Sequence, residues 1–250
     1  MAEHKANFPG ACMPGQARGI IKTIMLKKIF SRYTPLQIAI HIYAWSVLVI
    51  LVFKLITGDL SANPIQELEQ RTGRHAITLL ILSLACTPLN TLFRWTELLK
   101  RRRALGLYAF MYATLHIIIF MFDYGLAWSF IVQNIIEKPY ILVGLAGFLL
   151  LIPLAASSFD IWKKRLGKRW KRIHQTIYFI VPLLLLHYAW GKKGDFFALQ
   201  GEIIRPLIYT VIAVILLVMR IPPIRRFLAS LPSRILLLAR KRGTQPETTA

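Results

Sequence analysis

Residues 167–193 read GKRWKRIHQTIYFIVPLLLLHYAWGKK. An apolar run lies here between two basic flanks, and it is long enough to cross a bilayer as a helix, which takes about 20 residues. The run carries two histidines, His174 and His187, thirteen positions apart. An ionisable side chain inside hydrocarbon is costly and therefore indicates a functional site. Because a metal takes up the imidazole lone pair that lipid leaves unsatisfied, the pattern favours metal binding within a membrane.

Similar apolar runs recur along the chain, which has 250 residues, 56% of them hydrophobic. The second run is the shortest and is interrupted by Thr87-Pro88. Each run has about the length of a membrane-spanning helix, which takes roughly 20 residues. The sequence therefore predicts an all-α polytopic membrane protein, a bundle of six transmembrane helices. The six spans are expected near 36–56, 75–92, 105–122, 139–159, 173–190 and 203–221.

Four segments are expected along the chain. Residues 1–19 are polar and rich in Gly and Pro, which predicts a disordered N-terminal extension without the apolar core of a signal peptide. Residues 20–35 are expected to form a basic amphipathic lead-in on the membrane surface. Residues 36–221 hold the six-helix domain, and 222–250 form a basic cytoplasmic tail.

The formal net charge of +21 is distributed in short basic blocks between apolar runs. A nucleic-acid-binding protein carries its basic residues as a stripe on a soluble fold, so this distribution argues against nucleic acid as a partner. With a cytoplasmic N-terminus, 25 of the 32 Lys and Arg residues lie on the cytoplasmic side, and 7 of the 11 acidic residues lie on the other. The positive-inside rule therefore predicts that both termini are cytoplasmic. Cys12 and Cys86 are too few for a disulfide framework or a cysteine metal site.

His116 and His187 are expected at similar depths in the third and fifth spans, which both run outward from the cytoplasm. His116 follows Arg103 by 13 residues and His187 follows Arg172 by 15. At about 1.5 Å per residue, these positions lie roughly 20 Å and 22 Å from the inner boundary. We predict that the two imidazoles are the axial ligands of one haem iron. The alternative is that each is a hydrogen-bonding group between helices or a proton relay.

His174 lies only about 3 Å past Arg172 and so cannot share an iron with His187. It is either solvated at the inner interface or paired with His41, which lies in the inner half of the first span. His174 also marks the most suitable place for a quinol head group or a flavin, because a protonatable imidazole can accept the proton released there.

Three further predictions concern the outer face. His75 is expected to open the second span at the surface and to be solvated. Arg74, Lys192 and Lys193 are placed where they could pair with the carboxylates of a haem. Loops 57–74, 123–138 and 191–202 are expected to dock a partner outside the membrane.

Several stretches together resemble the MsrQ (YedZ) family of haem-binding membrane subunits and the broader ferric-reductase-like transmembrane group. The resemblance covers most of residues 36–221 in the same order and spacing. Its motifs are individually modest but jointly specific. They are NPIQELEQRTGRHA (63–76), TPLN (87–90), RRALGLYAFMYATLH (102–116), KPYILVGLAGFLLLIPLAASS (138–158) and LGKRWKRIHQTIYFIVPLLLLHYAW (166–190).

The resemblance implies a six-helix bundle of ferric-reductase-like type with a b-type haem held by His116, His174 and His187. It also implies an associated FMN, to which no residue of this sequence can be matched. The protein would sit in the bacterial inner membrane and pass electrons from the quinone pool, or from a cytoplasmic flavin reductase, to a periplasmic molybdopterin-containing reductase (MsrP). That partner repairs methionine sulfoxide in envelope proteins.

Two departures from the related NADPH oxidases affect this interpretation. Those proteins carry two histidines on the third helix, whereas Arg102 stands fourteen positions before His116 here. A second haem of that kind would lack this ligand unless His41 supplied it. No FAD or NADPH domain is appended, so we expect electrons to come from a separate donor.

The function predicted is that of a non-catalytic electron-transfer subunit, since two axial imidazoles leave no open position on the iron. The competing classes are a haem-free membrane scaffold and a transporter subunit. A transporter is expected to show inverted repeats and charged residues near the midplane, and the sequence shows no clear repeat.

Overall fold

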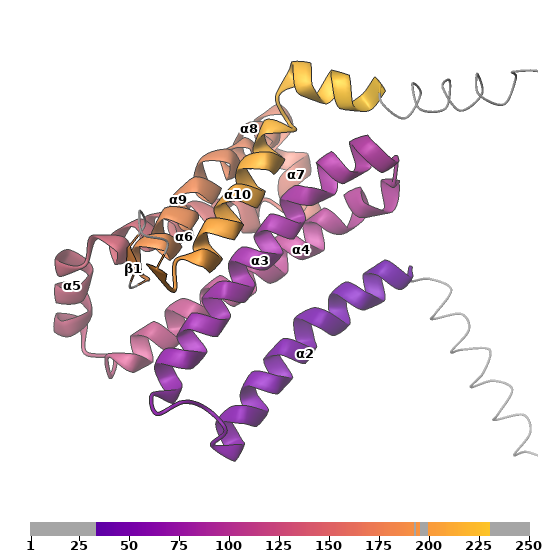
Figure 1. Ribbon diagram of the computed structural model, residues 1–250. Coiled ribbons are helices and arrows are strands. Elements are labelled where there is room, and N and C mark those ends of the chain that lie inside the picture. The colour runs from indigo at the N-terminus through magenta and orange to yellow at the C-terminus, as the bar shows by residue number, and fades with distance from the viewer. Residues whose placement is uncertain (1–33, 193, 196–199, 231–250) are drawn as a thin grey trace, which may run out of the picture. The chain divides into compact units, whose positions relative to one another are not determined.

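The computed structural model describes residues 34–192, 194–195 and 200–230. Contacts divide the chain into two compact units, and the boundary in the sequence falls within α2, between Val47 and Leu48. The predicted extension 1–19, most of the lead-in 20–35 and the end of the tail beyond residue 230 lie outside the described residues. The elements, shown in Figure 1, are α2 (Pro35–Thr57), α3 (Pro64–Phe93), α4 (Thr96–Asp123), α5 (Trp128–Glu137), α6 (Pro139–Ala156), α7 (Asp160–Leu166), α8 (Lys168–Gln175), α9 (Ile177–Trp190), β1 (Gly194–Asp195), β2 (Gln200–Gly201) and α10 (Ile204–Val218).

The predicted all-α membrane fold is confirmed. Among the residues that the structure describes, five helical segments are long and apolar enough to cross a membrane, the fifth being α8 and α9 taken together. A sixth span exists if α10 is counted with the helix Pro222–Ser230, which is bent from it by 82°. The described strands are two-residue segments, β1 and β2, paired antiparallel in the connection between α9 and α10.

Helix α3 differs from the short second span that the sequence predicted. It is 30 residues long, begins at Pro64 and continues through Pro88. Its start is fixed by Asn63, whose side chain accepts a hydrogen bond from the backbone N–H of Gln66 at 3.2 Å. Proline at the first helical position needs no N–H donor, so the sequence Asn63-Pro64 is a good helix start. The prediction of a break at Thr87-Pro88 was therefore wrong.

Helix α3 continues through Pro88 because a side chain from elsewhere satisfies the carbonyl that the proline leaves free. Pro88 has no N–H, so the carbonyl of Leu84 loses its usual partner four residues on. The guanidinium group of Arg220 donates to this carbonyl at 2.6 Å and also to the hydroxyl of Tyr178 at 2.9 Å. Neighbouring groups commonly satisfy proline-freed carbonyls in membrane helices.

Two segments expected to be loops are largely helical. Residues 64–74 form the first turns of α3, and residues 128–137 form α5. Helix α5 is amphipathic, with apolar and polar residues on different sides of the helix. A search of the sequence for long uninterrupted apolar runs does not detect such a short amphipathic helix.

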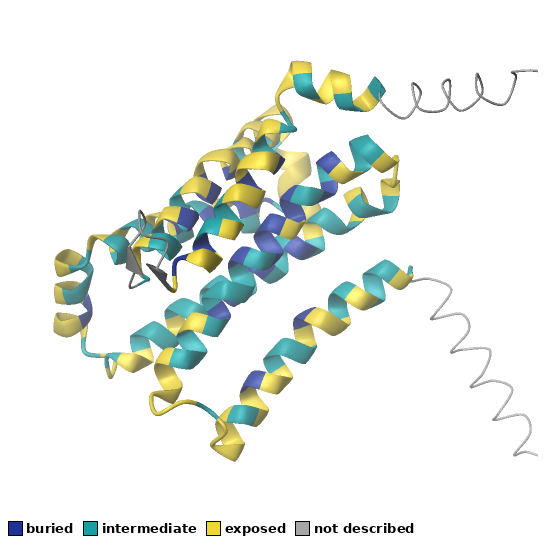
Figure 2. Cartoon of the chain, in the orientation of Figure 1, coloured by how far each residue is buried: buried dark blue, intermediate teal, exposed yellow. Residues whose placement is uncertain are grey.

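The core of the larger unit is built by two helix pairs, α3 with α4 and α6 with α9. Figure 2 shows buried positions along α3 in the middle of the bundle. The largest fully buried side chains include Tyr112, Leu79 and Ile180. Apolar side chains such as Phe179 and Leu149 are exposed on the outward faces of α9 and α6. In a membrane protein such faces contact lipid, so the pattern agrees with a membrane-spanning bundle.

Candidate functional site

The structure brings His116 of α4 and His187 of α9 together, as the sequence predicted. Their ring centroids lie 6.2 Å apart, and the ring planes make an angle of 73°. Two imidazoles on opposite sides of one metal ion place their ring centres roughly 6 Å apart, because each metal–nitrogen bond is about 2 Å long. The separation of the two rings therefore fits a single metal ion between them.

Both rings are held by the same kind of hydrogen bond. Nδ1 of His116 lies 2.9 Å from the backbone oxygen of Glu69 in α3, and Nδ1 of His187 lies 2.7 Å from that of Tyr140 in α6. A carbonyl oxygen only accepts, so Nδ1 is the protonated nitrogen in each ring and Nε2 carries the lone pair. Metal-binding histidines are commonly oriented by such a bond through the second ring nitrogen.

A glycine stands one helical turn after each of these carbonyls. Gly73 follows Glu69 by four residues, and Gly144 follows Tyr140 by four. A methyl group at Gly73 would lie 3.0 Å from Nδ1 of His116, and one at Gly144 would lie 2.5 Å from Nδ1 of His187. The absence of a side chain at these two positions lets each imidazole lie directly against the neighbouring helix.

The two histidines are separated from their carbonyl partners by the same number of residues. Each histidine follows its carbonyl partner by 47 residues. The hairpin of α3 and α4 and the pair of α6 and α9 thus present the same arrangement of carbonyl, glycine and imidazole. The surrounding side chains differ, which explains why the sequence showed no clear repeat.

A cavity of about 560 Å³ surrounds the two histidines. Its size lies in the range of about 300–1,000 Å³ that is usual for sites of small molecules and cofactors. Residues of α3, α4, α5, α6 and α9 form its walls. They are chiefly apolar and include Ile77, Leu80, Ala109, Ala113, Ile117, Phe120, Ile131, Ile135, Ile141, Leu145, Phe148, Leu151 and Leu184.

Polar groups gather at one end of this cavity. Arg74 lines it, and its buried Nε has no hydrogen-bond partner among the residues that the structure describes. Lys192, also on the lining, donates to the side-chain oxygen of Gln70 at 2.9 Å and pairs with Glu202. Arg74 and Lys192 thus line the cavity that holds the two histidines, and their pairing with haem carboxylates stays a prediction. Lys193 lies outside the described residues.

These observations fit a haem better than a metal ion bound by protein alone. Within residues 34–192, 194–195 and 200–230, no three His, Cys, Asp or Glu side chains come close enough to hold a metal ion. Haem iron already has four ligands from its macrocycle and needs only axial ones, which two imidazoles supply. The apolar walls suit the macrocycle, and Arg74 offers a cation to its carboxylates.

His174 lines a second cavity, of about 550 Å³. Nε2 of His174 lies 3.1 Å from the hydroxyl of Ser157, and its ring lies 4.3 Å from that of Trp170. The first cavity is lined by the N-terminal half of α3 and the C-terminal halves of α4 and α9, and the second by the opposite halves. The cavities therefore follow one another along the bundle, and His174 is separated from the His116–His187 pair.

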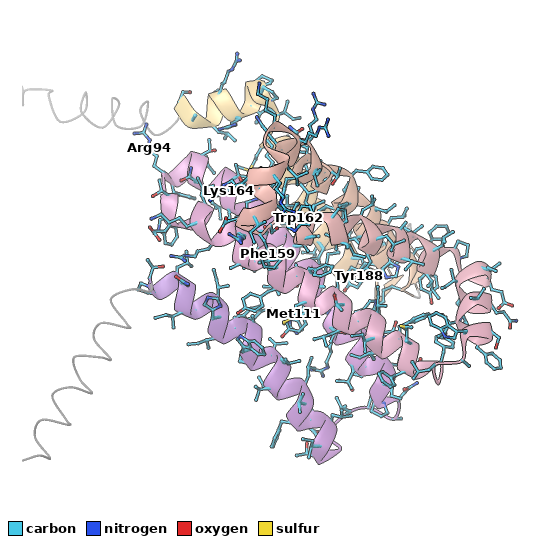
Figure 3. The ribbon with its side chains drawn as sticks, turned by 180° about the vertical axis from the view of Figure 1, so that it is seen from behind. Arg94, Met111, Phe159, Trp162, Lys164 and Tyr188 are labelled. Atoms are coloured by element: carbon cyan, nitrogen blue, oxygen red, sulfur yellow. The ribbon has the colours of Figure 1, made fainter. Side chains whose placement is uncertain are left out.

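The second cavity has a basic and aromatic lining. Arg102, Arg103, Lys163 and Lys171 contribute positive charges, and Asp160 pairs with Arg103 at 3.1 Å. Phe110 from this cavity stacks on Phe148 from the first, with centroids 5.6 Å apart and planes 6° from parallel. Figure 3 shows Tyr188, from the first cavity, on the α5 side of the α7 side chains Trp162 and Lys164.

The remaining histidines differ in how far the structure describes them. His41 lies in α2 within the N-terminal unit, so its pairing with His174 stays a prediction. His75 does not open a helix at the surface, because α3 begins eleven residues earlier. It is half-buried, with its ring 5.8 Å from that of Tyr112. The expectation that His75 begins the span and is solvated was wrong for this reason.

The sequence did not single out the groups that orient the histidines. Two of them are backbone carbonyls, which carry no sequence signal. Gly144 had a weak signal, since it is a glycine inside an apolar span, where a close approach of another group is a common reason for its presence. Gly73 had none, because it lies among polar residues that were expected to form a loop.

Comparisons with known proteins agree with this site. The family model of the ferric reductase like transmembrane component matches residues 72–186. The heme-binding subunit MsrQ of the protein-methionine-sulfoxide reductase of Herminiimonas arsenicoxydans is 41% identical over 166 residues, which cover 65% of this chain and 74% of that protein. The MsrQ subunit of Xanthomonas axonopodis pv. citri is 42% identical over 163 residues, covering 65% and 72%. No solved structure matches the chain. The chain therefore belongs to the MsrQ family of heme-binding subunits of protein-methionine-sulfoxide reductases, which have a ferric-reductase-like transmembrane fold.

Proposed function

We propose that this protein holds a b-type haem between His116 and His187 and carries electrons across the bacterial inner membrane. The electrons would reach a periplasmic molybdopterin-containing methionine-sulfoxide reductase, which repairs oxidised envelope proteins. The observation that carries the proposal is the 6.2 Å separation of two imidazoles that are each fixed through Nδ1.

A haem with two axial imidazoles supplies one-electron transfer and leaves no open position for substrate. The residues of this chain would hold the two axial imidazoles in a fixed orientation. The bonds to the carbonyls of Glu69 and Tyr140 fix the tautomer of each ring, and Gly73 and Gly144 leave room for it. Arg74 and Lys192 would hold the carboxylates of the macrocycle at the polar end of the cavity.

The charge distribution supports an orientation with both termini in the cytoplasm. The basic helices α7 and α8 flank the second cavity, and the positive-inside rule places such segments on the cytoplasmic side. The His116–His187 cavity then lies in the outer half of the membrane, near a periplasmic partner.

The second cavity is the proposed place of electron input. Its donor is a quinol from the quinone pool or a flavin, either FMN or the flavin of a cytoplasmic reductase. The Trp170 ring beside His174 offers a flat surface for such a ring system. His174 would accept the proton that a quinol releases on oxidation.

A reduced-minus-oxidised absorbance spectrum of the purified protein tests the haem. We expect a b-type band that is lost in His116→Ala and in His187→Ala, because each variant removes one of two axial ligands. His75→Ala is the matched control, since His75 lies on α3 but does not line the cavity. A colourless wild-type protein would support a scaffold instead, and a band that survives both substitutions would assign the ligands elsewhere.

Rapid-mixing kinetics with His174→Gln test the electron input. The variant should keep the absorbance band and its reduction by dithionite, while reduction by a quinol slows on the order of a hundredfold through loss of the proton acceptor. An unchanged quinol rate would remove His174 from this role. The reduced wild-type protein should then be reoxidised by the periplasmic reductase, and failure of that step would exclude the proposed partner.

A further inference from the structure

Helix α5 is attached at both ends to spanning helices. It is preceded by α4, which ends at Asp123, and only residues 124–127 lie between them. It is followed by α6, which begins at Pro139, and only Lys138 lies between them. Figure 1 shows α5 at the end of the bundle where α4 ends and α6 begins. Because both attachments lie at the same end of the bundle, α5 is held at that level of the membrane.

The side chains of α5 divide into three faces. At 100° per residue, Ile131 and Ile135 point to one side, and both line the His116–His187 cavity. Val132 and Ile136 lie on the adjacent side and are 49% and 75% exposed. A third, polar side carries Ser129, Gln133, Asn134 and Glu137.

The polar side is suited to water. Gln133 donates to the carboxylate of Glu137 at 2.7 Å, and the amide of Asn134 donates to the backbone oxygen of Phe130 at 2.9 Å. An apolar side chain is also exposed at the end of α4 that leads into α5, where Phe122 is 59% exposed. A helix with three such faces fits a position where protein, lipid and water meet.

We propose that α5 lies along the outer membrane surface, with Val132 and Ile136 inserted among lipid chains and Ile131 and Ile135 forming a wall of the His116–His187 cavity. The occupant of the exposed apolar side is lipid because α5 is tethered at membrane level between two spans. Trp128 at its start is 68% exposed and suits the interface, where tryptophan is enriched. Phe130 is the exception, since it projects from the polar side.

Site-directed spin labelling in vesicles of phosphatidylethanolamine and phosphatidylglycerol tests this placement. Single-cysteine variants Val132→Cys, Ile136→Cys and Gln133→Cys are made in the full chain with Cys12→Ala and Cys86→Ala. Labels at 132 and 136 should collide readily with oxygen, which dissolves in lipid, and poorly with a water-soluble nickel chelate. The label at 133, one residue away on the polar side, should show the reverse ratio.

Equal access of the nickel chelate to all three labels would overturn the proposal and indicate an apolar face that awaits a protein partner. Low access of both reagents at 132 and 136 would also overturn it, since those positions would then be buried in protein. The measurement needs no haem and no partner, so its result is independent of the proposed electron-transfer function. A helical circular dichroism spectrum and an unchanged size-exclusion profile of each labelled variant show that the bundle has folded.

Discussion

At Gly144, one missing side chain decides where an imidazole can lie. A methyl group there would be 2.5 Å from Nδ1 and 2.6 Å from Cε1 of His187. Such a contact is too short, so either the ring or helix α6 must move. Because the ring is bonded to the carbonyl of Tyr140 on the same helix, movement would break the bond that sets its tautomer.

We therefore predict that Gly144→Ala lowers haem affinity by about tenfold or more, the usual effect of disturbing the groups that orient a metal ligand. Haem content and the midpoint potential of the purified variant measure this. Gly147→Ala is the control on the same helix, since its methyl group would lie 2.6 Å from Cδ2 of Leu184 and 3.1 Å from its Cγ and would meet a leucine instead of a histidine ring. Equal loss in both variants would point to helix packing rather than to His187.

Gly73→Ala should be milder than Gly144→Ala. Its methyl group would lie 3.0 Å from Nδ1 of His116, so a shift of a few tenths of an ångström relieves it. The two histidines themselves could be predicted from the sequence, because residue counts from the basic flanks give their depths. The carbonyls and glycines that orient them could not, because they depend on which helices pack together.

At the scale of elements, α3 shows how a distant side chain lets a helix continue through a proline. A proline in an apolar run suggests a break, so the sequence predicted an interruption at Thr87-Pro88. The predicted span 75–92 was too short at its other end, because residues 64–74 are largely polar. The guanidinium group of Arg220, far along the chain, satisfies the carbonyl of Leu84 that Pro88 leaves free. No local pattern could reveal this contact.

Replacing Arg220 tests the role of this bond. Arg220→Gln should destabilise the protein by about 1–3 kcal/mol, because the carbonyl of Leu84 loses its charged donor. In the background of Pro88→Ala the same substitution should have a smaller effect, since the alanine N–H restores the helical bond. Thermal unfolding of the four proteins in detergent measures the difference. Arg225→Gln, an exposed neighbour, is the control, and equal effects in both backgrounds would contradict the account.

At the scale of the whole molecule, the larger unit places two cavities one after the other along a single helical bundle. The membrane class and five of the six expected spans could be predicted, because the sequence itself shows the length of each apolar run and its basic flanks. The sixth span depends on counting α10 together with the bent helix Pro222–Ser230. The second cavity is only partly anticipated: His174 was expected at a separate depth, but Ser157 and Trp170 reach it through contacts between helices. Helix α5 was missed because its apolar side is too short to stand out among spans.

Electron paramagnetic resonance of the oxidised protein at low temperature tests the central claim most directly. If His116 and His187 bind one iron, the wild-type protein shows a low-spin ferric signal typical of two axial imidazoles. His116→Ala and His187→Ala should each replace it with a high-spin signal or lose the haem. A low-spin signal that persists unchanged in either variant would contradict the shared iron.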